Sequence, residues 1–232
     1  MSFRLAFPLV LGIIASTSIP ASAGLLTGNA GFETAGLNAT DSALWSEFAD
    51  TNAVSERDST MPLVGSYAHH LMATGATGLG ASAGINQNSI ADVGLPSLQE
   101  GTSVSAEFQW KGSLGTGGVA FAVLRILNGV GAIVADTGLQ PLPNTGGSYT
   151  LQSLPMLNVP AFGGGPNDTY AAFLEISVGA GAFVGSTAEG FVDSVNVSGT
   201  TVPVPEPSPL ALLGLIGLVT IAGRRWKRNR TL

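Results

Sequence analysis

The middle of this chain is divided into short segments by Gly, Asn, Ser and Pro, which recur about every ten residues. This feature limits the fold most, because segments of that length suit strands better than helices. The clearest segment, SVSAEFQW at 103–110, alternates strictly between polar and apolar residues, which predicts a half-buried strand. Its apolar positions are Val104, Ala106, Phe108 and Trp110.

The neighbouring segments support an all-β fold. Residues 118–127 are apolar on both faces except at Arg125, which is typical of a central strand. Within the central body, no stretch shows a convincing 3.6-residue period with helix caps. The sequence therefore predicts an antiparallel β-sandwich of the jelly-roll type. The other expected strands lie at 66–73, 132–136, 149–154, 170–178 and 191–197.

The charge of the central body, residues 24–200, excludes one class of function. The body holds 14 of the 15 acidic residues and only Arg57, Lys111 and Arg125 as basic residues, a net charge of about −11. Binding to nucleic acid requires basic side chains that neutralise phosphates, so we do not expect this body to bind nucleic acid.

The first 23 residues have the pattern of a secretory signal peptide. Arg4 precedes an apolar stretch, and Ala21 and Ala23 form an A-x-A cleavage site that leaves Gly24 as the first mature residue. The chain has no Cys, so an exported protein of this sequence must be stabilised by its core or by a bound metal rather than by disulfides.

The C-terminal part has three segments: a Pro-rich linker at 201–209, a single apolar transmembrane helix at 210–223 and a basic cytoplasmic tail at 224–232. As a helix, the run from Leu210 to Ala222 is about 20 Å long, which is shorter than the roughly 30 Å hydrocarbon core. The segment is therefore either a marginal permanent anchor or a sorting tail that is removed.

The order of motifs in this tail resembles the PEP-CTERM sorting domain. That resemblance implies an exported substrate of an exosortase-type enzyme in a Gram-negative bacterium. The precursor would be anchored in the inner membrane, and the processed protein would reach the cell envelope or the extracellular (biofilm) matrix. The residues that carry the resemblance are Pro205, Glu206, Pro207, Arg224 and Arg225.

The body resembles carbohydrate-binding-module-like domains with a galactose-binding-like jelly roll. GNAGFETAGLNATDSALWSEF is similar to their opening block, PLVGSYAHHLMA to their second strand and AEGFVDSVNVSG to their last strand. The resemblance implies a sandwich and, as an alternative function, recognition of exopolysaccharide. The matching positions in the opening block are Asn29, Gly31, Phe32, Glu33 and Trp45.

Asp193 is unusual on physical grounds. Strand alternation is expected to place it on one face with Phe191, Val195 and Val197, where a carboxylate must be paired, capped or bound to metal. The resemblance implies a structural calcium ion held by Glu33 and Asp193, which would tie the first strand to the last. The alternative is an Asp at the sheet rim that is solvated or bonded to a turn.

Other candidate sites are weaker. Adjacent strand residues point to opposite faces, so His69 and His70 are not expected to bind one ion together. Trp45 and Trp110 are expected to be packed rather than exposed to a sugar. The sequence contains no G-x-S-x-G, H-E-x-x-H or P-loop motif, so we expect no enzyme.

Overall fold

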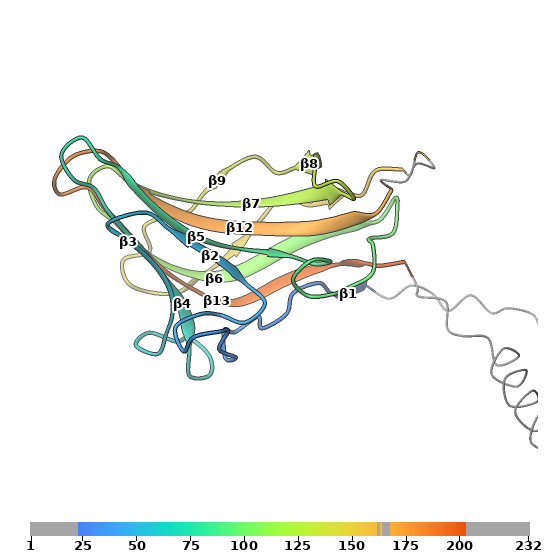
Figure 1. The fold of residues 1–232 in the computed structure, drawn as a ribbon, viewed down its shortest axis with the longest axis horizontal. Helices are drawn as coiled ribbons and strands as arrows, with labels where there is room; N and C mark the ends of the chain where they lie inside the picture. The colour runs from blue at the N-terminus through green and yellow to red at the C-terminus, as the bar shows by residue number, and fades with distance from the viewer. Residues whose placement is uncertain (1–22, 162, 164–167, 203–232) are drawn as a thin grey trace, which may run out of the picture.

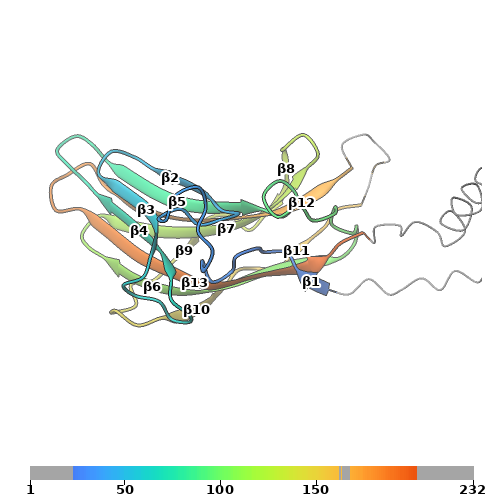
Figure 2. The same cartoon turned by 60° about the horizontal axis from the view of Figure 1, so that its bottom comes forward.

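The computed structural model describes residues 23–161, 163 and 168–202, and it confirms an all-β architecture. Two antiparallel sheets face one another as the layers of a sandwich (Figures 1 and 2). Over these residues the chain forms no helix, and so contains none that could cross a membrane. The expected signal peptide at 1–23, apart from Ala23, and the expected tail helix at 210–223 lie outside the described residues.

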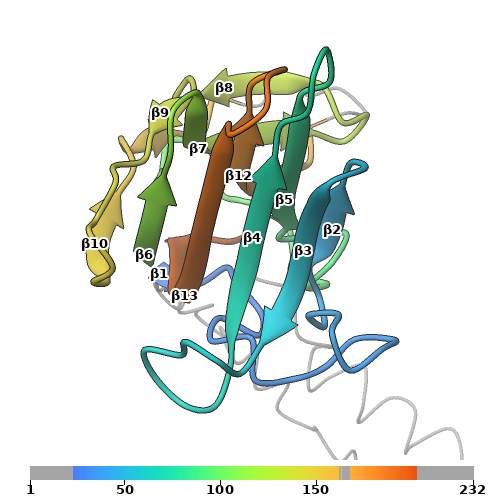
Figure 3. The same cartoon turned by 90° about the vertical axis from the view of Figure 1, so that its left-hand side faces the viewer.

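One layer is a seven-stranded sheet, in which β10, β6, β13, β4 and β3 lie side by side in that order (Figure 3). β1 pairs with β13, and β11 pairs with β6. The strands are β1 (Ala23–Leu25), β3 (Ala53–Asp58), β4 (Ala68–Thr74), β6 (Ser103–Leu114), β10 (Thr150–Ser153), β11 (Leu157–Asn158) and β13 (Thr187–Thr200).

The other layer is a six-stranded sheet with the order β2, β5, β12, β7 and β8, and β9 pairs with β7. Its longest contact joins β12 to β7 from Tyr170 to Ala180. The strands are β2 (Ser46–Ala49), β5 (Ala81–Asn88), β7 (Gly118–Asn128), β8 (Ile133–Asp136), β9 (Gln140–Pro141) and β12 (Tyr170–Ala180).

The core lies between the two sheets and confirms the alternation read at 103–110. Trp110 is fully buried, and its indole Nε1–H donates to the Pro143 carbonyl at 2.9 Å. Gly112 and Gly190 flank the ring, and a Cβ at either position would overlap it. Burial of these large side chains supplies the main stabilisation, at about 25 cal/mol per Å² of apolar surface. The largest buried side chains include Phe108, Leu71, Ile85, Leu124, Ile126, Leu174 and Ile176.

Each expected strand matches one in the structure to within a few residues, but the sequence did not predict β2, β3 and β5 or the short strands β1, β9 and β11. β3 reads AVSERD and β5 reads ASAGINQN, so neither shows a strong apolar alternation. Both are held by pairing, β3 to β4 and β5 to β12. These two segments therefore form strands because they pair with other strands of the sheet, and not because of their own residue pattern.

The two ends of the described chain meet. Ala23 pairs with Thr200 and Leu25 pairs with Ser198, so the first strand lies against the last. The first residue expected in the mature protein, Gly24, is within this contact. The first and last strands of the described chain therefore lie side by side, with Ala23 and Thr200 at the same end of the sandwich (Figure 1).

Candidate functional site on the outer face of the seven-stranded sheet

A row of polar and aromatic side chains crosses the outer face of the seven-stranded sheet. His70 on β4 pairs with Glu56 on β3 and with Phe191 on β13, and Phe191 pairs with Lys111 on β6. Residues directly opposite in an antiparallel pair project to the same face. Neighbouring Trp110 and Val192 are buried, so this row is on the opposite face, away from the core.

His70, Phe191 and Lys111 help to line a groove, here called the outer groove, with a volume of about 280 Å³. The sequence analysis did not identify it, because its residues meet only when β3, β4, β13 and β6 come together. The groove is lined by Asp58, Thr60, Met61, His70, Lys111, Gly112, Ser113, Gly147, Glu189 and Phe191.

His70 is the central side chain of the outer groove. Its ring stacks on Phe191, with centroids 4.5 Å apart and 14° between the planes. Nε2 lies 3.0 Å from Glu189 Oε1, which is hydrogen-bonding distance. Nδ1 lies 3.8 Å from Glu56 Oε1, is buried and has no hydrogen-bond partner. One ring nitrogen is therefore satisfied and the other is not.

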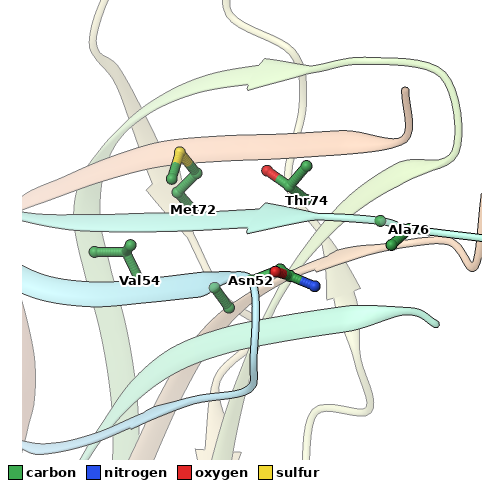
Figure 4. Close-up of a pocket in the computed structure, with 7 residues that line it drawn as sticks. Asn52, Val54, Met72, Thr74 and Ala76 are labelled. Carbon is green, nitrogen blue, oxygen red and sulfur yellow. The ribbon is translucent and has the colours of Figure 1, made fainter. Parts of the chain in front are cut away.

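An apolar hollow adjoins the outer groove. Figure 4 shows Val54 and Met72 on neighbouring strands, with Asn52, Thr74 and Ala76 toward one end of the hollow. Met72 pairs with Val54 on one side and with Glu189 on the other. The outer face thus combines an acidic centre with an apolar flank.

Asp193 also belongs to the outer face, which corrects part of the expectation. It shares a face with Phe191 but not with Val195 and Val197. The pairing of β13 with β6 shifts between Asp193 and Asn196, where Ser194 adopts a positive φ of 51°. This β-bulge turns the following valines toward the core.

Asp193 is fully buried because the segment 63–67 covers it. Its Oδ2 accepts hydrogen bonds from the backbone N–H groups of Leu63 and Val64, at 2.9 and 3.0 Å. Its Oδ1 accepts the N–H of Ser194 at 2.5 Å. The carboxylate is thus capped by amides, one of the three states expected for it.

Glu33 holds the same segment. Its Oε1 accepts the N–H groups of Ser66 and Tyr67 at 2.9 and 3.1 Å, and a Cβ added to Gly31 would lie within 4 Å of both carboxyl side chains. The carboxylates of Glu33 and Asp193 therefore both bind the backbone of segment 63–67. Oxygen donors of this kind are those that calcium prefers. Because the amides already bind these oxygens, an ion would strengthen this contact rather than create it.

His69 has a structural role. It is fully buried, with Nδ1 2.9 Å from the Ser42 hydroxyl and Nε2 2.9 Å from the Ser55 hydroxyl. The Ser55 hydroxyl donates to the Gly84 carbonyl, so its oxygen is free to accept from Nε2–H. Burial, with a smaller effect from His70, lowers the pKa of His69 to about 3. A neutral, buried ring of this kind is a poor general base, and Ser42 is buried as well.

The two tryptophans of the body are packed, as expected. Trp110 is in the core, and Trp45 contacts Phe32 with ring centroids 5.3 Å apart. Trp45 is 7% exposed and its Nε1–H donates to the Asn29 carbonyl. Neither ring offers a free face to a sugar.

The sorting residues cannot be placed in the fold. Pro205, Glu206, Pro207, Arg224 and Arg225 lie outside the described residues, as does Ala21. Ala23 and Gly24 lie in β1. The sequence itself carries the evidence for these segments.

A family model described as the PEP-CTERM protein-sorting motif matches residues 203–228. The chain carries a PEP-CTERM sorting motif. Such a motif implies an exported protein, a C-terminal membrane-anchoring signal and an exosortase-type processing enzyme. The match begins three residues after the last strand ends. No curated protein matches the sequence.

Several solved structures resemble the sandwich. The enzymatically active domain of tailspike protein 4 from bacteriophage CBA120 aligns with a TM-score of 0.51 and 18% identity, over 76% of this chain and 21% of that one. This chain therefore spans about a fifth of the tailspike chain. The CBM22-1 xylan-binding domain of Paenibacillus barcinonensis Xyn10C aligns with a TM-score of 0.46 and 10% identity, over 80% of this chain and all of that one.

A cyclase from Fischerella sp. TAU aligns with a TM-score of 0.47 and 14% identity, over 79% of this chain and all of that one. The likeness to the tailspike domain, at 18% identity, shows the β-sandwich fold and no activity.

Proposed function

We propose that this chain is an exported, non-enzymatic protein of the cell envelope or extracellular matrix, whose C-terminal tail an exosortase-type enzyme removes. The observation that carries the proposal is the PEP-CTERM match directly after the sandwich. The short apolar run agrees with it, because a helix of about 20 Å is a poor lasting anchor in a core of roughly 30 Å.

The physical basis for processing lies in the residues before the apolar run. Pro205 and Pro207 favour an extended backbone that lacks two amide donors, and Glu206 places one charge between them. An extended segment of this kind suits the cleft of a processing enzyme. These residues would be recognised and would do no chemistry themselves.

Mass spectrometry of the C-terminus of the protein recovered from its host tests the proposal. We expect the wild-type chain to end before Leu210, and Glu206→Ala to accumulate as a precursor that retains Leu232. Val202→Ala, just outside the motif, is the matched control and should be processed normally. A mature wild-type protein that still ends at Leu232 would refute removal of the tail.

We also propose that calcium binds between Glu33 and Asp193. The support is that both carboxylates bind the backbone of segment 63–67. In addition, neither carboxylate forms an ion pair with a Lys or Arg side chain of the described chain. Thermal unfolding with and without chelator tests this, followed by add-back of calcium to the wild-type and Glu33→Gln proteins. We expect calcium to restore several degrees of Tm to the wild-type protein but not to Glu33→Gln, since 1 kcal/mol shifts Tm by about 2–4 °C at this size. A midpoint that does not respond to chelator or calcium would contradict the proposal.

Recognition of exopolysaccharide is the second candidate, and the outer groove favours it. The groove places the carboxylates of Asp58 and Glu189, which can accept hydrogen bonds from sugar hydroxyls, beside an apolar hollow that suits a sugar ring. Pull-down with the host's exopolysaccharide tests it. Binding should fall for Glu189→Ala and persist for Phe183→Ala, an exposed residue outside the groove. Equal binding by both variants would remove the groove from consideration.

A further inference from the structure

A set of side chains with the composition of a metal site lies at the edge of the outer groove, where Asp58 and His70 line the groove and Glu56 adjoins them. One ligand atom each from Glu56, Asp58 and His70 lies within 4.8 Å of the other two. Glu56 and Asp58 are two residues apart on β3 and therefore project to one face, and His70 lies directly across from Glu56 on β4. The rigid pairing of two strands thus brings the three side chains together.

The hydrogen bonding of His70 leaves one nitrogen free for a cation. Glu189 accepts a hydrogen bond from Nε2–H at 3.0 Å, and this contact fixes the tautomer with the lone pair on Nδ1. Nδ1 is buried and has no hydrogen-bond partner, and the Glu56 carboxylate lies 3.8 Å from it. A buried acceptor beside other acceptors is unfavourable unless a cation lies between them.

The distances agree with shared coordination. Nδ1 and Glu56 Oε1 are 3.8 Å apart, too far for a hydrogen bond. That separation suits two ligand atoms that are each about 2.1 Å from one ion. Within the described chain, neither Glu56 nor Asp58 forms an ion pair with a Lys or Arg side chain. Their negative charge is therefore available to a cation.

We propose that a divalent transition-metal ion of the zinc class binds at the edge of the outer groove, through His70 Nδ1 and the carboxylates of Glu56 and Asp58. One imidazole and two carboxylates suit zinc better than calcium, which takes six to eight oxygen ligands. Glu189 is a positioning residue, because a carboxylate on the second ring nitrogen orients a metal-bound histidine. Three protein ligands leave a coordination position open toward the groove for water or a ligand oxygen.

The proposal is independent of the sorting function and of the calcium site. It also differs from a simple ion pair, in which a second proton on His70 would satisfy Nδ1 beside Glu56. The experiment must therefore distinguish a metal from a proton at Nδ1.

The chain contains only two histidines, so ¹⁵N labelling of histidine makes a direct test. The full chain is purified in detergent without a histidine tag, treated with chelator and titrated with zinc chloride. We expect saturation at one zinc per chain and a change in the Nδ1 resonance of His70, with the proton on Nε2 retained. His69 is the internal control, since both of its nitrogens are bonded and buried, and its resonances should not move.

Matched variants complete the test. His70→Gln and the double variant Glu56→Gln/Asp58→Asn should abolish saturable zinc binding, and Glu189→Gln should weaken it about 10- to 100-fold while the stoichiometry stays the same. Glu33→Gln, at the other candidate site, should bind zinc normally. The proposal is overturned if wild-type protein binds no zinc at micromolar concentrations, or if His70 is unaffected while zinc binds.

Discussion

Glu47 gives the sharpest test of the energetics of this fold. It lies on β2 opposite buried Ile85, and its side chain is 16% exposed. Burial, aided by the charges of Asp41 and Glu56, raises the pKa of Glu47 from 4.5 to about 7, although hydrogen bonds from Ser42 oppose the change. The folded protein therefore keeps a proton on Glu47 that the unfolded chain releases above pH 4.5.

The sign and size of the effect follow from linkage. The stability linked to protonated Glu47 is fully present below pH 4.5 and is lost as pH rises through about 7. A pKa difference of this size corresponds to roughly 3 kcal/mol, and residual solvation of the side chain reduces this to about 2 kcal/mol. Glu47→Gln keeps the carbonyl oxygen that accepts the Ser42 N–H at 2.6 Å but removes the titration.

Urea unfolding of the wild-type and Glu47→Gln proteins at pH 4.5 and pH 8 measures this directly. We expect the two proteins to differ by less than about 0.5 kcal/mol at pH 4.5, and the variant to be more stable by about 2 kcal/mol at pH 8. The pH-dependent contributions of the other titrating groups are common to both proteins, so they cancel in the difference between their free energies of unfolding. A difference that is the same at both pH values would refute the argument from burial.

Three further predictions concern buried groups. Asp193→Asn should lower the free energy of unfolding by about 2 kcal/mol in urea titrations, because an amide cannot accept all the hydrogen bonds that cap the carboxylate; an unchanged value would show that the cap is not needed. Gly190→Ala should destabilise the protein by about 3 kcal/mol, because its Cβ would overlap the Trp110 ring, whereas Gly179→Ala meets only ordinary contacts; equal melting temperatures would contradict this packing. The ring of His69 should stay neutral by NMR down to pH 4.5, and its contribution to stability should be lost as pH falls from 6.5 toward 3; titration near pH 6.5 would show that the ring is accessible.

The sequence predicted those strands whose own alternation of polar and apolar residues shows which face is buried. The alternation from Val104 to Trp110 was sufficient, because one face of β6 packs on the core and the other faces solvent. β3 and β5 were missed because their polar and small residues become strands only through pairing with β4 and β12. The sorting motif was also recognisable, since it depends on the order of residues and not on contacts.

The candidate sites were predicted less completely. The resemblance pointed to Glu33 and Asp193, and in the structure both carboxylates accept hydrogen bonds from the backbone of segment 63–67. The bulge at Ser194, however, changed which residues share a face with Asp193. A backbone φ of 51° at a serine leaves no clear sequence signal. The partners of His70 were missed because the register across β3, β4 and β13 defines them. The i, i+2 spacing of Glu56 and Asp58 was the only local hint.

The position of β13 has a consequence for biogenesis. This strand is the last to be synthesised, yet it lies between β6 and β4 in the middle of its sheet and also pairs with β1 (Figure 3). Until Thr200 has been translocated, the sheet remains two separate halves with open edges, which are prone to aggregation. The seven-stranded sheet can therefore be completed only after Thr200 has been made, three residues before the sorting motif begins. Under the proposed function, the domain would complete its fold just before the tail is presented for processing.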